Sequence, residues 1–250
     1  MRLKASLEIR QNIKEEVECF TKLYKETGGN FSTGSWSKNR TQKILEKTGI
    51  FCYNPQNNIL DFGCGTGTYA TILSKTFFHI TGVDIVPTNL KVASVNGKVT
   101  RYVLGDCNAL PYRDSAFDIV VCGQTLHHFP CIHIPLEQIN RVLKKGGLLF
   151  ILEPNKYNPI ISLQFKFRRY WHFFTKRWRW TSNERPISIF QCQKELKKSG
   201  FYIKKTATIN FAREYAKGIW HLLDRHSFLI EKIPLVNLLG GTVMIIAQKK

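Results

Sequence analysis

Two aspartates follow a glycine-rich turn in the first half of the sequence, at spacings that suit a nucleoside ligand. Gly63, Gly65 and Gly67 alternate in the segment ILDFGCGTGTYA, between an apolar run and a helical pattern. Glycines there let the backbone turn tightly and come close to a ligand. Asp84 ends the next apolar run, where a carboxylate can accept both ribose hydroxyls, and Asp106 follows 22 residues later, beside the expected place of the base.

Asp61 opens the glycine turn, and its charge separates two kinds of nucleotide site. A dinucleotide brings a pyrophosphate to such a turn, where an adjacent carboxylate would repel it. A carboxylate instead suits a cationic group such as an ammonium. The residues therefore favour a nucleoside with a positively charged tail, and a turn that merely connects two elements is the competing interpretation.

Two adjacent histidines, His127 and His128, lie in the segment LHHF, just beyond the apolar run FDIVVCG. Ligands of open α/β sheets bind at the carboxyl ends of the strands, and a histidine there could deprotonate a hydroxyl group. We prefer His128 as the candidate base, because Phe129 and Pro130 would fix the chain behind it. The alternative is that one ring packs in the interior and the other is solvated.

The elements that must position these residues follow from alternating apolar runs and helical stretches. This alternation is typical of βαβ units and predicts a doubly wound, mostly parallel sheet. A helix is expected from Pro135 to Gly146 and another from Ser188, as its N-cap, to Gly200. The expected strands are 58–62, 79–84, 100–104, 117–123, a run from Leu148, 201–211 and 242–248.

Five motifs occur in one order, namely DFGCGTG (61–67), Asp84, GDCNALPYRDSAFDIV, LHHF and RVLKKGGLLFILEPN. Together they resemble the successive motifs of class I S-adenosylmethionine-dependent methyltransferases, in particular the group that includes the ubiquinone- and menaquinone-biosynthesis enzymes. The resemblance covers about residues 58–155. It implies a Rossmann-like sheet of seven strands in the order 3-2-1-4-5-7-6, with strand 7 antiparallel.

The resemblance also implies how the cofactor, S-adenosyl-L-methionine, is held. Asp61 and the backbone of the glycine turn, Gly63 to Gly67, would bind the methionine part. The remaining implied contacts are Asp84 with the ribose hydroxyls, Ile85 with the adenine face, Asp106 and the Cys107 backbone with the adenine edge, and Gln124 near the sulfonium. For Gln124, a polar residue satisfied within the core is the competing interpretation.

The positive charge of the chain is concentrated in its last hundred residues. The formal net charge is +19, and residues 151–250 contain 19 Lys and Arg against 6 Asp and Glu. An insertion at about 155–186 carries much of it, together with a stripe at helical spacing formed by Ile160, Leu163, Phe167, Tyr170, Trp171, Phe174 and Trp178. Further apolar residues, Ile161, Phe165, Phe173 and Trp180, lie off that stripe.

Three interpretations of this insertion compete. It could be a lid that packs over the substrate, residues 156–180 could bind an anionic membrane surface, or its cations and aromatic rings could bind RNA. We expect the lid or the membrane rather than RNA, because no RNA-binding module is recognisable in the sequence.

The composition of the sequence constrains the domain organisation and the cellular location. We expect an N-terminal helical cap over 1–50 and a methyltransferase domain over 51–250. The seven scattered cysteines lack the spacing of a zinc site or a disulfide framework, which predicts buried thiols in a reducing compartment. No apolar run is long enough to span a bilayer, and the N-terminus lacks the apolar core of a signal peptide, so we expect a cytoplasmic location or one at the surface of a membrane.

The sequence therefore predicts a methyltransferase that uses S-adenosyl-L-methionine and acts on a small-molecule or lipid-linked acceptor. Two alternatives remain, an RNA methyltransferase and a non-catalytic module that keeps the cofactor site as a scaffold. The sequence does not determine the acceptor atom or the oligomeric state.

Overall fold

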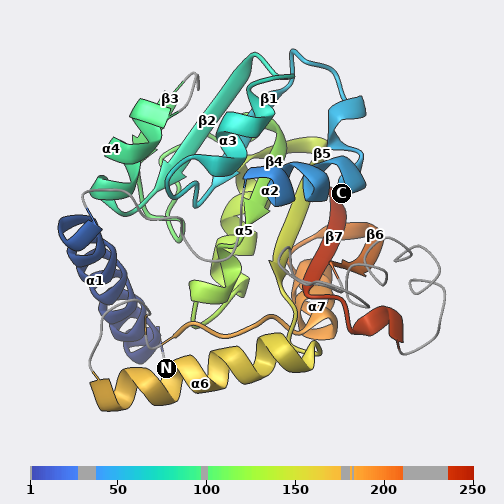
Figure 1. Cartoon of the computed structure of the whole chain (residues 1–250). Helices are drawn as coiled ribbons and strands as arrows, with labels where there is room; N and C mark the ends of the chain where they lie inside the picture. Colours follow the sequence, from blue (N-terminus) through green and yellow to red (C-terminus); the bar gives the residue numbers. More distant parts are fainter. Residues whose placement is uncertain (1, 28–37, 97–100, 176–180, 182, 211–235) are drawn as a thin grey trace.

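The computed structural model describes residues 2–27, 38–96, 101–175, 181, 183–210 and 236–250 (Figure 1). Its strands form one sheet in the order β3-β2-β1-β4-β5-β7-β6, which confirms the predicted order. Neighbouring strands from β1 to β5 pair in parallel, and β7 is antiparallel to both β5 and β6. The strands are β1 (Asn58–Phe62), β2 (His79–Asp84), β3 (Arg101–Leu104), β4 (Phe117–Gly123), β5 (Leu143–Pro154), β6 (Phe201–Ile209) and β7 (Thr242–Lys249).

Helices cover both faces of this sheet, as the alternating pattern predicts. The described α-helices are α1 (Arg2–Thr27), α2 (Lys38–Thr48), α3 (Thr68–Leu73), α4 (Pro87–Asn96), α5 (His133–Val142), α6 (Pro159–Thr175) and α7 (Ile189–Lys198). Short 3-10 helices are η1 (Ile50–Cys52), η2 (Leu126–His128) and η3 (Val236–Leu238).

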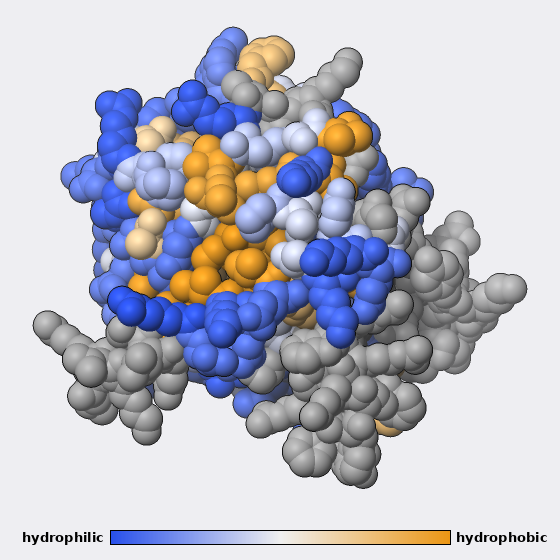
Figure 2. Space-filling view, turned by 90° about the vertical axis from the view of Figure 1, so that its left-hand side faces the viewer, coloured by the Kyte–Doolittle hydropathy of each residue, from blue (hydrophilic) through white to orange (hydrophobic). Residues whose placement is uncertain are grey.

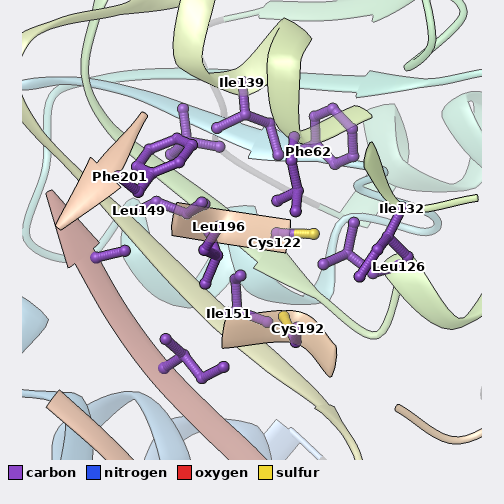
Figure 3. Close-up of a cluster of buried hydrophobic side chains, with 14 of the residues drawn as sticks. Phe62, Cys122, Leu126, Ile132, Ile139, Leu149, Ile151, Cys192, Leu196 and Phe201 are labelled. Atoms are coloured by element: carbon purple, nitrogen blue, oxygen red, sulfur yellow. The ribbon is translucent and has the colours of Figure 1, made fainter. Parts of the chain in front are cut away.

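The core consists of two apolar layers, one on each face of the sheet. Successive side chains of a strand point to opposite faces, so Leu149 and Ile151 of β5 belong to one layer and Phe150 and Leu152 to the other. The first layer, shown in Figure 3, packs against α5 and α7. The second packs against α2 and α3. The central strands are thus buried on both faces, as their continuous apolar runs indicate.

The boundary between α5 and β5 differs from the prediction. The helix was expected to run from Pro135 to Gly146, but it begins at His133 and ends at Val142, and β5 begins at Leu143. Leu143 is fully buried and pairs with Phe117 at the start of β4, so tertiary packing takes this residue out of the helix. Gly146, with a φ of +75°, lies within the strand rather than at a helix end.

Other predictions concern the last third and the cysteines. Ser188 is confirmed as the N-cap of α7, because its Oγ accepts a hydrogen bond from the N–H of Gln191. All seven cysteines are free, but Cys52, the last residue of η1, and Cys131, between η2 and α5, are exposed. The prediction of uniformly buried thiols is therefore wrong for these two.

The two N-terminal helices have different surroundings. Ile44 and Leu45 of α2 are fully buried in the second core layer, whereas α1 lies at the end of the sheet that α6 also borders (Figure 1). Figure 2 shows the side of the molecule on which α1 and α4 lie, where hydrophobic residues gather in the middle and hydrophilic ones surround them. Among the described residues, no helix combines the length and apolarity needed to cross a membrane.

Candidate active site

The glycine-rich turn joins β1 to α3 and packs against the turn that follows β4. Gly63 has a φ of +67°, and a Cβ atom there would lie 2.2 Å from Cγ2 of Thr125, so any side chain at this position would collide. Gly65, with a φ of +52°, has open space where its side chain would be. The first glycine therefore permits two turns to pack closely, and the second leaves open space beside the turn.

Asp61 lies beneath this turn and is almost completely buried. Its Oδ2 accepts a hydrogen bond of 2.9 Å from the N–H of Ala70, at the start of α3, whereas its buried Oδ1 has no partner among the described residues. Burial, with a smaller contribution from the charge of Asp84, raises the pKa of Asp61 to about 7. A buried carboxylate with one unpaired oxygen is a favourable place for a cation.

Asp84, at the end of β2, lies on the opposite side of the glycine turn. Its Oδ2 accepts the N–H of Gly65 at 2.8 Å, and its Oδ1 accepts the N–H of Val86 at 2.8 Å and the amide of Asn89 at 3.4 Å. Burial raises the pKa of Asp84, although these hydrogen bonds oppose the shift. The neighbouring Ile85 is half-buried. The structure thus brings Asp84 to the glycine turn, as expected of a ribose-binding carboxylate.

Asp106 and Cys107 follow β3 on the same side of the sheet. The Oδ1 of Asp106 accepts the N–H of Asn108 at 2.7 Å, and its side chain is half-buried, so this carboxylate shapes its own loop and stays partly accessible. The thiol of Cys107 is buried and lies against the backbone of Gly63, and burial raises its pKa well above the usual value. The thiol of Cys107 therefore serves for packing, and only its backbone is a candidate to contact the adenine edge.

Gln124 and Thr125 form the turn after β4. Gln124 has a φ of +58°, and its amide donates to the carbonyl of Leu152 at 3.1 Å. The hydroxyl of Thr125 bonds the carbonyls of Phe62, at 3.1 Å, and Gly63, at 3.2 Å. Thr125, which the sequence reasoning missed, is thus the residue that joins this turn to the glycine turn, while the role of Gln124 near the sulfonium stays a prediction.

The two histidines of η2 have separate carboxylate partners. The ring of His127 is buried, and its Nδ1 lies 2.7 Å from Oε2 of Glu153 in β5. The Nδ1 of His128 lies 3.0 Å from Oε1 of Glu16 in α1, and Glu184 lies 3.8 Å away. The two imidazole rings lie against each other in a tilted arrangement, with centroids 4.1 Å apart and an interplanar angle of 39°.

His128 is held as a cation. Burial opposes a charge on its ring, but Glu16, Glu184 and Glu153 outweigh burial and raise the pKa of His128 to about 10. Conversely, the pKa of Glu16 is lowered, because the charge and hydrogen bond of His128 and the hydroxyl of Thr181 overcome its burial. A histidine that is already protonated at neutral pH cannot accept a proton, so this setting favours His127 as the base, and the catalytic role of either ring stays a prediction.

The residues around the histidines come from segments far apart in the sequence. Asn12 of α1 donates to the carbonyl of His128, and Asn183 donates to Asn12. Phe165 of α6 meets the ring of His127 edge-on, with centroids 6.0 Å apart. One signal for this arrangement is visible in the sequence, namely Glu153, an acid in the otherwise apolar run LLFILEP. The sequence carries no local signal for Glu16.

The residues present fit a nucleoside with an ammonium group. The unpaired oxygen of Asp61 and the open space beside Gly65 lie at one turn, and Asp84 borders it. When bound there, S-adenosyl-L-methionine supplies a methyl group on a positively charged sulfur. Within the described residues, no cluster of three His, Cys, Asp or Glu side chains suits a metal ion.

The sheet order and the glycine turn together define the class I methyltransferase fold. Residues 60–151 match a family model described as a methyltransferase domain, and this domain together with the fold indicates S-adenosylmethionine as the cofactor.

Curated relatives include demethylmenaquinone methyltransferases of Staphylococcus aureus strains JH9 and Newman. Each is 34% identical over 119 residues, which is 43% of this chain and 49% of the relative. The chain thus spans about half the length of these relatives.

Similar solved structures include a possible histamine N-methyltransferase from Thermotoga maritima and a methyltransferase from Archaeoglobus fulgidus. The first has a TM-score of 0.62 and 19% identity over 95% of this chain and 98% of the other. The second has a TM-score of 0.61 and 17% identity over 85% and 95%. A [4+2]-cyclase also shares the fold, with a TM-score of 0.61 and 21% identity over 88% and 84%. At this level of identity the likeness shows the fold and does not fix the reaction.

Proposed function

We propose that this chain is an S-adenosyl-L-methionine-dependent methyltransferase that acts on a small-molecule or lipid-linked acceptor. The observation that carries the proposal is the buried Asp61, whose unpaired oxygen lies beneath a turn with open space beside Gly65. Transfer of a methyl group from a sulfonium needs mainly alignment and the removal of water. Asp61 and Asp84 would orient the cofactor, and the turn after β4 would face the acceptor.

The acceptor class is inferred from the relatives and from the surroundings of the histidines. The S. aureus relatives are named as methyltransferases of demethylmenaquinone, and we propose its reduced form as the first acceptor to test. Phe165 beside His127 supports an aromatic acceptor, because aromatic rings pack favourably against one another. Its hydroxyl groups would also need a proton acceptor, which a histidine can supply.

The test is methyl transfer from labelled S-adenosyl-L-methionine to three materials in parallel. These are short-chain demethylmenaquinone in its reduced form, a cellular lipid extract and total cellular RNA. We expect label in the quinone or in the lipid extract, and much less of it with Asp84→Ala at a limiting concentration of the cofactor. Label in RNA alone would establish the RNA alternative, and tight cofactor binding without transfer to any fraction would favour the non-catalytic alternative.

The outward face of α6 supports an anionic membrane surface as the partner that presents a lipid-linked acceptor. Ile160, Leu163 and Phe167 are exposed by 43%, 68% and 61%, whereas Ile161 and Phe165 are half-buried. The described residues of the stripe therefore face outward, and the residues off the stripe face inward. The side chains of Tyr170, Trp171, Phe173 and Phe174 and the residues Trp178 and Trp180 lie outside the described part of the chain.

Cations accompany this apolar face. Lys156 and Lys166 are exposed beside it, and Arg168 and Arg169 follow on the same helix. An amphipathic helix of this composition binds in the headgroup region of an anionic bilayer, where apolar side chains enter and cations meet lipid phosphates. We propose that residues 156–180 lie on such a surface.

Vesicle flotation tests this surface, with phosphatidylglycerol in phosphatidylcholine compared with phosphatidylcholine alone. We expect Leu163→Gln with Phe167→Gln to weaken association at least about tenfold, because burying one such side chain is worth ~1.5–3 kcal/mol. The matched control is Val95→Gln with Tyr202→Gln, which alters exposed apolar residues on α4 and β6. Equal flotation of wild type and the α6 variant would exclude the membrane and leave a lid.

A further inference from the structure

Glu153 is a completely buried carboxylate in β5, and all its hydrogen bonds go to the turn after β4. Its Oε1 accepts the N–H groups of Thr125 and Leu126, each at 2.7 Å, and its Oε2 contacts Nδ1 of His127 at 2.7 Å. Two backbone donors fix the plane of the carboxylate, and the third bond fixes the imidazole. Thr125 in turn bonds the carbonyl of Gly63, so Glu153 links His127 to the cofactor turn.

This contact determines which nitrogen of His127 carries hydrogen. A carboxylate only accepts hydrogen bonds, so Nδ1 must be the donor, and a neutral ring then has its lone pair at Nε2. No hydrogen bond of Nε2 is found within the described residues. The groups that face His127 are Glu153 from β5, the neighbouring ring of His128 and the ring of Phe165 from α6.

The second histidine has the opposite electrostatic setting. Glu16 from α1 and Glu184 from the segment after α6 surround His128, and both favour its charged form. Thr181 donates a hydrogen bond of 2.7 Å to Glu16, which holds that carboxylate in place. Of the two rings, His127 is therefore the one with a lone pair to offer.

We propose that Glu153 is a positioning residue, which holds His127 so that Nε2 takes the proton of a hydroxyl-bearing acceptor. This inference rests on the proposed function. For the reduced quinone, the proton moves from the acceptor hydroxyl to Nε2, and the electron pair released on the oxygen is conjugated through the ring, so that the adjacent ring carbon forms the bond to the methyl carbon. The sulfur keeps the pair of the broken carbon–sulfur bond, and the methylated ring carbon then loses its hydrogen to solvent as a proton, which restores the aromatic ring. His127 afterwards returns the proton to solvent.

Glu153→Gln is the decisive variant, because it should preserve the fold and exchange one tautomer of His127 for the other. The two N–H groups of Thr125 and Leu126 require an acceptor, so the glutamine oxygen must occupy the place of Oε1. Its NH₂ group then faces Nδ1 of His127 and donates to it. Hydrogen is thereby forced onto Nε2, and the lone pair needed for catalysis is lost.

The first measurement is the tautomer of His127 by ¹⁵N NMR, assigned through His127→Asn. We expect hydrogen on Nδ1 in the wild type and on Nε2 in Glu153→Gln. In Glu16→Gln, the tautomer of His127 should stay that of the wild type, while the pKa of His128 falls from about 10 towards its ordinary value. Hydrogen on Nε2 in the wild type, or an unchanged tautomer in Glu153→Gln, would overturn the proposal.

The second measurement is the rate of methyl transfer to reduced short-chain demethylmenaquinone. Glu153→Gln should lower kcat by about 10²–10⁴-fold, the usual contribution of a positioned base, with the cofactor Kd within about twofold. The loss should shrink as pH approaches the pKa of the acceptor hydroxyl, because the acceptor then ionises unaided. Glu195→Gln, which removes the Glu195–His133 contact at α7, is the matched control and should keep the wild-type rate.

The two measurements separate failure of this inference from failure of the proposed function. An inverted tautomer with an undiminished rate would show that His127 does not take the proton, and would overturn the inference. If the wild type methylates no acceptor, the proposed function fails and this inference fails with it, whereas the tautomer result would still report how Glu153 orients the ring.

Discussion

At the scale of single residues, Asp61 makes the affinity for the cofactor depend on pH. Because burial raises its pKa to about 7, Asp61 must lose a proton before it can pair with an ammonium group. At pH values below 7, the affinity for S-adenosyl-L-methionine should therefore increase about tenfold for each unit by which the pH is raised. Calorimetry in two buffers of different ionisation enthalpy should detect proton release at pH 6. Asp61→Asn should bind weakly with no such slope, and an equal slope in that variant would assign the proton to another group.

Asp84 gives a second prediction for the cofactor. Asp84→Ala should weaken the binding of S-adenosyl-L-methionine by about 1.5–3 kcal/mol, the range for hydrogen bonds to a charged acceptor. Calorimetry measures this directly, and NAD serves as the contrasting ligand, which the wild type should bind more weakly because Asp61 repels its phosphates. Unchanged affinity in Asp84→Ala would remove this residue from the site.

These aspartates were predictable from the sequence because each lies at or next to the carboxyl end of a strand. Parallel strands bring their carboxyl ends to one edge, so spacing alone placed Asp61 and Asp84 together. The choice between the histidines depended on Glu16, which lies 112 residues away from His128 and has no local pattern that indicates such a contact. Long-range ion pairs of this kind require the folded structure.

At the scale of elements, tertiary contacts decided what the sequence pattern left open. The α5 boundary was misplaced because Leu143 pairs with β4. The pattern identified α6 as amphipathic, and only the structure shows that Leu163 and Phe167 face outward. Periodicity identifies an amphipathic helix, but it does not say which face meets the protein when both faces carry apolar residues. The sheet order was predicted correctly because it followed from the resemblance of consecutive motifs.

Helix α1 is anchored to the site by the pair between Glu16 and His128, which predicts a pH-dependent stability. The pKa of His128 is about 10 in the folded protein and about 6.5 in the unfolded chain. The ion pair therefore makes its full contribution to the free energy of unfolding below about pH 6.5, and this contribution is lost as pH rises through 10. The lowered pKa of Glu16 adds stability that is lost as pH falls into the acid range. We expect Glu16→Gln to cost roughly 2–4 kcal/mol near pH 6, and much less near pH 10.

Urea unfolding of wild type and Glu16→Gln at a series of pH values measures this difference. The matched control is Glu18→Gln, which removes an exposed contact of 3.9 Å with Lys14 on the same helix and should cost less than about 0.5 kcal/mol. A difference between wild type and Glu16→Gln that stays constant from pH 6 to pH 10 would show that Glu16 acts through packing instead of charge.

At the scale of the whole molecule, charge and apolar surface coincide. The last hundred residues carry most of the net charge of +19, and the outward face of α6 lies within them. α6 also contacts the candidate site, because Phe165 meets His127 on its inward side. A surface that binds a bilayer at this helix would bring the bilayer and the site to the same end of the sheet, which suits an acceptor dissolved in lipid.

The charge predicts how binding to anionic vesicles depends on salt. Each cation near such a surface contributes about 1 kcal/mol, so replacing Arg168, Arg169, Lys176 and Arg177 by Gln should weaken binding by about 10³-fold at low salt. At high salt, screening should bring wild type and this variant together, whereas the Leu163→Gln and Phe167→Gln variant should bind more weakly than wild type at every salt concentration, because burial of apolar surface is not screened. Flotation across a salt series measures both effects. Affinity for RNA that exceeds the affinity for vesicles at every salt concentration would assign the positive charge to nucleic acid and overturn the membrane interpretation.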